Sequence, residues 1–101
     1  MPAYMIITAH IRDREGFVAT YAKAAAGLVA KHGGEYVFRG QGPGIALEGD
    51  ADDGAVVLVS RWPDMATLRG FWESPDYVAL KALRQDLADV RVLAVEGEWV
   101  G

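Results

Sequence analysis

The stretch AVVLVSRW, residues 55–62, is the most strand-like segment of the chain. Val56 to Val59 form a near-continuous apolar run, which is typical of a strand that is buried on both faces. We therefore place residues 55–62 at the centre of a β-sheet, and the elements on either side of it are expected to supply its neighbours.

Residues 3–12 predict a second strand because β-forming side chains alternate there. One side of this strand carries Tyr4, Ile6, Thr8 and His10, and the other side carries Met5, Ile7, Ala9 and Ile11. Both sides are largely apolar. In a sheet that carries helices on one side only, the second apolar side needs a cover, and a second copy of the chain would supply it.

Three helix starts are visible from their capping residues. Asp13 is suited to cap a helix that runs to about Lys31, where Gly33-Gly34 ends it. Asp64 is suited to cap a short helix after Pro63. Ser74 followed by Pro75 is typical of a helix start, and this last helix is expected to reach about residue 87.

The remaining segments complete the sheet. Residues 35–39 and 45–49 predict a hairpin around a glycine-rich turn, residues 50–54 predict an acidic turn, and residues 90–100 predict the last strand. The order β-α-β-β-β-α-α-β is a split β-α-β plan with an extra hairpin strand. It indicates one α+β domain over residues 1–101 with a ferredoxin-like antiparallel sheet and helices on one face.

Composition excludes several functions. Ten basic against fourteen acidic residues give a net charge of −4, which lacks the basic footprint of a nucleic-acid-binding protein. The chain has no cysteine, so disulfides and thiolate sites are excluded. No apolar stretch approaches the length of a membrane span and no signal peptide precedes the domain, so we expect a cytoplasmic protein without membrane association.

Many positions together resemble the family catalogued as domain of unknown function 1330, within the dimeric α/β-barrel superfamily. The resemblance covers nearly the whole chain, and Gly70 departs from it where the family has alanine. It rests on Tyr4, Asp13, Tyr21, Gly33-Gly34, Arg39, Leu47-Glu48-Gly49, Trp62-Pro63, Met65, Phe71-Trp72, Ser74-Pro75-Asp76-Tyr77, Leu80-Lys81, Leu83-Arg84 and Glu96-Gly97.

This resemblance implies two ferredoxin-like protomers that pack their sheets face to face, with a pocket between each sheet and its helices. It implies no common activity. Some members of the wider superfamily are cofactor-independent monooxygenases, haem-degrading enzymes or isomerases, and others are binding or structural modules. Whether this chain is an enzyme is left open by its residues.

His10 and Glu48 are the candidate catalytic residues. Because histidine side chains in general change charge near neutral pH, His10 is a candidate general base at a pocket mouth. The simpler interpretation is a strand-end histidine that is hydrogen-bonded at a dimer edge. His32 is expected to cap the first helix. The two histidines have no metal-site spacing, and we expect neither a metal nor a cofactor.

Arg39, Glu48 and Arg84 each lie beside an apolar face, and they are expected to meet beneath the helices. An arginine pair is able to clamp a ligand carboxylate. The alternative is an internal Arg–Glu pair that only ties helix to sheet.

Tyr21, Trp72 and Tyr77 are suited to line an aromatic pocket, although residues at such spacing are more often simply core. The working hypothesis is a homodimer that binds a small aromatic or carboxylate-bearing metabolite, or acts on it without a cofactor. Its expected ligand contacts are Tyr21, Arg39, Trp72, Tyr77 and Arg84. The rival hypothesis is a dimeric structural or interaction module without catalytic activity.

Overall fold

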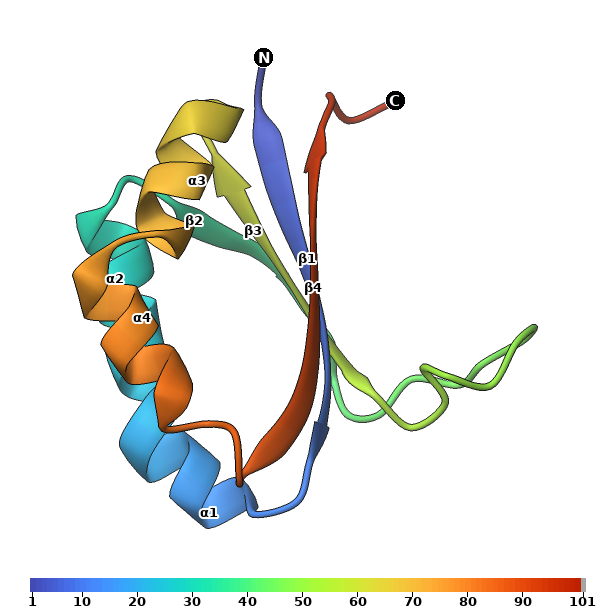
Figure 1. Ribbon diagram of the computed structural model, residues 1–101. Helices are drawn as coiled ribbons and strands as arrows, with labels where there is room; N and C mark the ends of the chain where they lie inside the picture. Colours follow the sequence, from blue (N-terminus) through green and yellow to red (C-terminus); the bar gives the residue numbers. More distant parts are fainter. Residues whose placement is uncertain (101) are drawn as a thin grey trace.

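The computed structural model describes residues 1–100, and its centre is a four-stranded antiparallel sheet (Figure 1). The strands are β1 (Ala3–Ile11), β2 (Glu35–Arg39), β3 (Val56–Trp62) and β4 (Ala88–Glu96), in the order β2-β3-β1-β4. β3 lies inside the sheet, as its apolar run predicts. The arrangement is the ferredoxin-like fold expected from the sequence.

All helices cover the same side of this sheet (Figure 1). The first helical segment is α1 (Arg14–Phe17), a π-helical turn η1 (Val18–Ala22) and α2 (Lys23–Lys31). The second pair is α3 (Met65–Trp72) and α4 (Pro75–Ala82). Within residues 1–100, no helix has the length and apolar character needed to cross a membrane.

The predicted caps are confirmed. Asp13, Asp64 and Ser74 each accept a hydrogen bond from a backbone N–H three residues further along. Pro75 occupies the start of α4, where its missing N–H costs nothing. His32 ends α2 at the predicted position, and its backbone N–H donates to the carbonyl of Leu28. The predicted interaction of its side chain with the last carbonyls is not seen, because its Nε2 lies near Asp76 and has no hydrogen-bond partner.

The core lies between the helices and the sheet around Trp62, which is 1% exposed. The Trp62 indole donates a hydrogen bond to the Ser60 hydroxyl over 3.0 Å, so its polar atom is satisfied in an otherwise apolar setting. Its ring packs against Phe71 with centroids 4.9 Å apart. Gly34 passes over the other part of the ring, where a Cβ atom would lie 2.7 Å from Trp62 Cζ2.

The other side of the sheet carries no helix, and we call it the open face. Register places Ile6 of β1 between Val59 of β3 and Leu93 of β4 on this face. Ile6 is 36% exposed and Leu93 is 60% exposed. The open face is therefore apolar and uncovered, as the two apolar sides of the first strand predict.

The predicted strand over residues 45–49 is wrong. Residues 40–55 form a long loop, called the arm below, which projects from the open face on the side away from the helices (Figure 1). β2 already fills the edge beside β3, and the five glycines of the arm disfavour strand structure. The sheet has four strands and the extra hairpin strand is absent from the described residues.

The last helix is also shorter than expected. α4 ends at Ala82 instead of about residue 87, because the backbone tightens into turns in which Leu83 bonds to Leu80 and Arg84 bonds to Lys81. As a result Leu83 is 55% exposed and Arg84 is buried. A helix that continued to residue 87 would instead have kept Leu83 on the same face as Tyr77 and Leu80.

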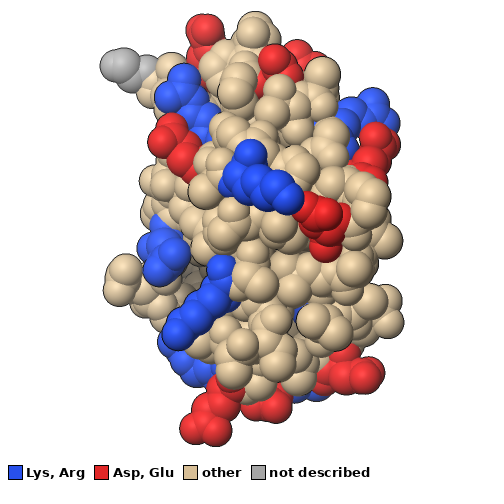
Figure 2. All heavy atoms as spheres, turned by 90° about the vertical axis from the view of Figure 1, so that its left-hand side faces the viewer, with Lys and Arg blue, Asp and Glu red and all other residues tan. Residues whose placement is uncertain are grey.

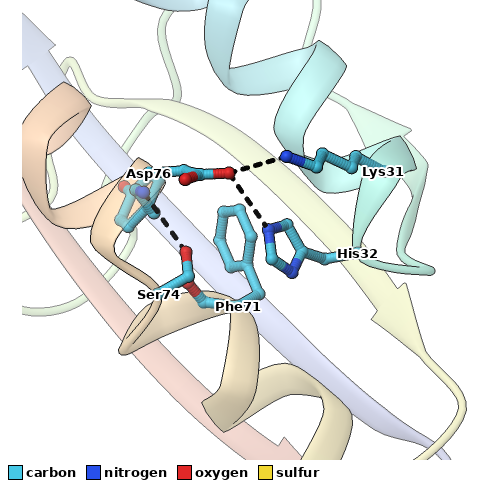
Figure 3. Close-up of polar contacts among 6 residues, drawn as sticks. Lys31, His32, Phe71, Ser74 and Asp76 are labelled. Atoms are coloured by element: carbon cyan, nitrogen blue, oxygen red, sulfur yellow. Dashed lines mark hydrogen bonds and ion pairs between the residues drawn. The ribbon is translucent and has the colours of Figure 1, made fainter.

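A polar joint holds α4 against the end of α2 (Figure 3). Lys31 Nζ lies 2.8 Å from Asp76 Oδ2, and His32 Nε2 lies 3.9 Å from the same oxygen. The hydrogen bond and charge of Lys31 hold the pKa of the Asp76 carboxyl below its usual value. Asp76 precedes Tyr77, so this joint fixes the position of Tyr77 beneath the helices.

Replacing Gly34 with alanine should lower the free energy of unfolding by roughly 1–3 kcal/mol, because the new methyl group would collide with the Trp62 ring. Gly70→Ala is the matched variant: nothing lies within 4 Å of its Cβ position, and it should raise the free energy by about 1 kcal/mol. Urea unfolding measures both. Equal effects of the two substitutions would contradict the close packing of Gly34 on Trp62.

Asp76→Asn should lower the melting temperature slightly at neutral pH. A carboxyl whose folded pKa is depressed contributes stability above its unfolded pKa, and this contribution is lost as the pH falls through the folded value. The difference between wild type and Asp76→Asn should therefore vanish in acid. Asp86→Asn is the control, because Asp86 has no ion pair within residues 1–100. A difference that persists in acid would argue against the joint.

Candidate functional site

A cavity of about 500 Å³ lies between the sheet and the first helical segment. Three alanines of η1 and α2, which are Ala22, Ala25 and Ala26, face it, and larger side chains there would fill the space. Ile7 and Leu58 form part of its floor on the sheet. The small side chains of this helical segment therefore leave an apolar space next to the core.

The cavity carries a local positive charge. Arg14, Lys23 and Arg39 contribute to its lining, and none of the lining residues is acidic. All three cations are exposed and lie around the opening, which we call the rim. Because the whole chain has a net charge of −4, this grouping runs against its average and favours an anionic ligand. Figure 2 shows the helix-covered side, where basic side chains lie beside a hollow.

Two tyrosines supply the polar groups of the wall. Tyr21 of η1 and Tyr36 of β2 both line the cavity. The Tyr21 and Tyr77 hydroxyl oxygens lie 2.6 Å apart, and Tyr77 is 4% exposed. Burial is the main cause that raises the pKa of Tyr21, and the neighbouring Tyr77 raises it further. The Tyr21 hydroxyl therefore stays protonated at neutral pH and is able to donate a hydrogen bond.

Arg84 is the most unusual group of the site. It is 8% exposed, and its guanidinium lies over the Tyr21 ring, 5.6 Å from the centroid. Its Nε is buried with no hydrogen-bond partner, and Arg84 takes part in no ion pair among residues 1–100. A buried cation normally has a carboxylate partner, because its removal from water is costly.

The structure brings together most of the predicted ligand contacts. Tyr21, Tyr77 and Arg84 form one cluster, and Trp72 packs against Tyr77 with ring centroids 5.3 Å apart. Of the five predicted contacts, Tyr21 and Arg39 line the cavity, whereas Trp72, Tyr77 and Arg84 lie outside its lining. Lys81 stacks on the Trp72 ring.

The two candidate catalytic residues lie elsewhere. His10 is on the open face, where its Nε2 lies 3.2 Å from the Ala51 carbonyl oxygen. Glu48 is exposed in the arm and does not meet Arg39 and Arg84 beneath the helices of its own chain. The expected convergence of Arg39, Glu48 and Arg84 is wrong, because residues 45–49 leave the sheet instead of returning along it.

Sequence reasoning missed Tyr36. Simple strand alternation would place residues 36 and 39 on opposite faces. The register shifts between Tyr36 and Phe38, so that Tyr36 pairs with Ser60 and Arg39 pairs with Leu58, and both face the helices. Arg14 and Lys23 were also missed, since exposed charges on a helix carry no signal of a site.

Comparisons with known proteins show the family and the fold of the chain. The model of a family described as domain of unknown function (DUF1330) matches residues 2–98. No curated protein matches the chain.

Several solved structures share the fold. A protein of unknown function from Rhodopseudomonas palustris is 21% identical with a TM-score of 0.78, over 98% of this chain and 84% of that chain. SnoaB, a cofactor-independent oxygenase from Streptomyces nogalater, is 14% identical with a TM-score of 0.68, over 98% of this chain and 95% of its own. A protein from Arabidopsis thaliana is 15% identical with a TM-score of 0.67, over 98% of both chains.

Proposed function

This chain belongs to the DUF1330 family of domains of unknown function, and we propose that it binds a small metabolite that carries a carboxylate on an aromatic or apolar body. The observation that carries the proposal is Arg84, whose buried Nε has no hydrogen-bond partner and whose guanidinium lies over Tyr21, a lining residue of the cavity with the cationic rim. A carboxylate would satisfy both features. A guanidinium binds a carboxylate with two parallel hydrogen bonds, which gives orientation as well as affinity.

Each side chain has a distinct part in this proposal. Arg39 and the other rim cations attract the anion, and the alanine-lined space accepts its apolar body. Tyr21 donates a hydrogen bond, and Tyr77 holds the Tyr21 hydroxyl in place. Arg84 pairs with the carboxylate. Trp72 packs behind Tyr77 and supports its ring.

The site is also suited to chemistry on the bound molecule without a cofactor. Tyr21 and Tyr36 keep their protons at neutral pH, because burial raises the pKa of both. With Arg84 nearby, these hydroxyls would stabilise an oxyanion that develops on the ligand. The fold shared with the cofactor-independent oxygenase SnoaB is compatible with such a role.

We further propose that the molecule is a homodimer that buries the open face. Ile6, Phe38, Leu93 and Val95 are 36–60% exposed on that face. An apolar patch of this kind on one side of a sheet is typical of an interface. A second copy is the simplest cover, because a two-fold axis brings the same patch onto itself.

The rival function is a dimeric module whose cluster only ties helix to sheet. The two functions predict opposite effects on stability when Arg84 is replaced. If Arg84 is structural, its replacement destabilises the fold. If Arg84 binds a ligand, the free protein carries a buried charge without a partner, and its replacement does not destabilise the fold.

Arg84→Met should abolish binding and leave the free protein as stable as the wild type, or more stable by about 1 kcal/mol. The measurement is thermal unfolding with a panel of aromatic and aliphatic carboxylates. A carboxylate at about 100 times its Kd should add about 2.7 kcal/mol to the wild type and almost nothing to the variant. Arg69→Met, an exposed arginine of α3, should respond like the wild type. A destabilised Arg84→Met variant with no response of the wild type to any carboxylate would favour the structural module.

Leu93→Glu should convert the dimer into a monomer, because it places a charge in the middle of the open face. Val78→Glu is the matched control: Val78 is 51% exposed on α4, on the helix side. Sedimentation velocity distinguishes the two variants. A wild type that sediments as a monomer would contradict the proposed assembly.

A further inference from the structure

The arm has a fixed shape. The Gly44 backbone N–H donates to Ala55 over 2.7 Å, the Gly54 N–H donates to Gly44 over 2.9 Å, and the Ala46 N–H donates to the Asp53 carboxylate over 3.0 Å. These bonds close the arm on itself. It is therefore held out from the sheet as a defined structure.

The base of the arm is also tied to the open face. His10 of β1 lies 3.2 Å from the carbonyl oxygen of Ala51, and Arg91 of β4 forms an ion pair of 3.2 Å with Asp52. His10 thus acts as a positioning residue for the arm. Two contacts from two different strands set the direction in which the tip points.

The tip of the arm carries apolar side chains in water. Ile45 is 82% exposed and Leu47 is 96% exposed, and Glu48 beside them is also exposed. Large apolar side chains on a rigid projection are typical of a contact surface. The tip lies on the same side as the open face, so the arm continues that surface (Figure 1).

The arm and the cavity rim lie at the same end of the sheet. β1 and β2 both end there, at Ile11 and Arg39, and the rim cation Arg14 follows β1 directly. Their charges are opposite: the rim is cationic, and the arm carries Glu48, Asp50, Asp52 and Asp53. Glu48 and Asp50 take part in no ion pair within residues 1–100.

We infer that the arm of a second copy closes the cavity, with its Glu48 against the rim cations and its Ile45 and Leu47 packed at the opening. This inference rests on the proposed homodimer. It also requires that the two-fold axis of the dimer runs along the strands. Both arms and both rims then lie at one end of the dimer. Each arm then passes the end of the other sheet.

The arm is long enough for this contact. Packed sheets lie about 10 Å apart. Gly44 is held next to Ala55 by a backbone hydrogen bond, so the limb that projects freely runs from Gly44 to Glu48, and its four residues span at most about 14 Å. This span exceeds the separation of packed sheets, so the tip is able to reach the end of the sheet of the second copy, where the rim lies. The ligand site is complete only in the dimer.

Disulfide trapping tests the inference directly, because the chain has no cysteine of its own. The double variant Arg14→Cys/Glu48→Cys is oxidised gently as a mixture of ¹⁵N-labelled and unlabelled chains, and the linked peptides are weighed. We expect a 14–48 disulfide between two chains. It should form about 100-fold faster than in the control, since an effective concentration in the millimolar range replaces a micromolar one.

Arg69→Cys/Glu48→Cys is the control, because residue 69 is exposed on α3 at the other end of the sheet. A 14–48 link within one chain, or one that forms no faster than the control in a sedimenting dimer, overturns the arm exchange and leaves the homodimer intact. A monomer in sedimentation overturns both. Neither result depends on the ligand, so the binding proposal is judged separately.

Discussion

Helices cover only one side of the four-stranded sheet, and the main features of the molecule follow from this asymmetry. The covered side holds the Trp62 core and, beside it, a cavity that small side chains leave open. The uncovered side exposes Ile6 and Leu93 and carries the arm. A chain of this length has a modest core, so burial of the second side of the sheet in a dimer would add hydrophobic stabilisation that the monomer lacks.

On the covered side, polar contacts between the helices fix how the helices lie over the apolar core. The hydroxyl pair of Tyr21 and Tyr77 links the first helical segment to the last one, and the Lys31–Asp76 joint holds α4 where this link is made. Arg84 is the group without such a partner. Among residues 1–100, His32 Nε2 and Arg84 Nε are the buried side-chain nitrogens without a hydrogen-bond partner. His32 has the Asp76 carboxylate 3.9 Å away, whereas Arg84 has no ion pair, and the proposed ligand carboxylate would supply one.

Local signals in the sequence were sufficient for the elements that local chemistry decides. The caps at Asp13, Asp64 and Ser74 and the central β3 run follow from side chains a few residues apart. Long-range geometry decided the rest. The register shift in β2 turns Tyr36 toward the helices, and the early end of α4 exchanges Leu83 for Arg84 in the buried layer. Neither event has a signature in the spacing of apolar residues.

The pairing of Arg84 with a ligand carboxylate is the central claim, and NMR of the arginine Nε–Hε groups observes it directly. Titration with a simple aromatic carboxylate such as benzoate should move the Arg84 resonance strongly and saturably. The Arg69 resonance, from an exposed side chain, should stay in place. Movement of Arg69 alone, or of all arginines in proportion to added salt, would show that the buried guanidinium does not receive the anion and would contradict the account.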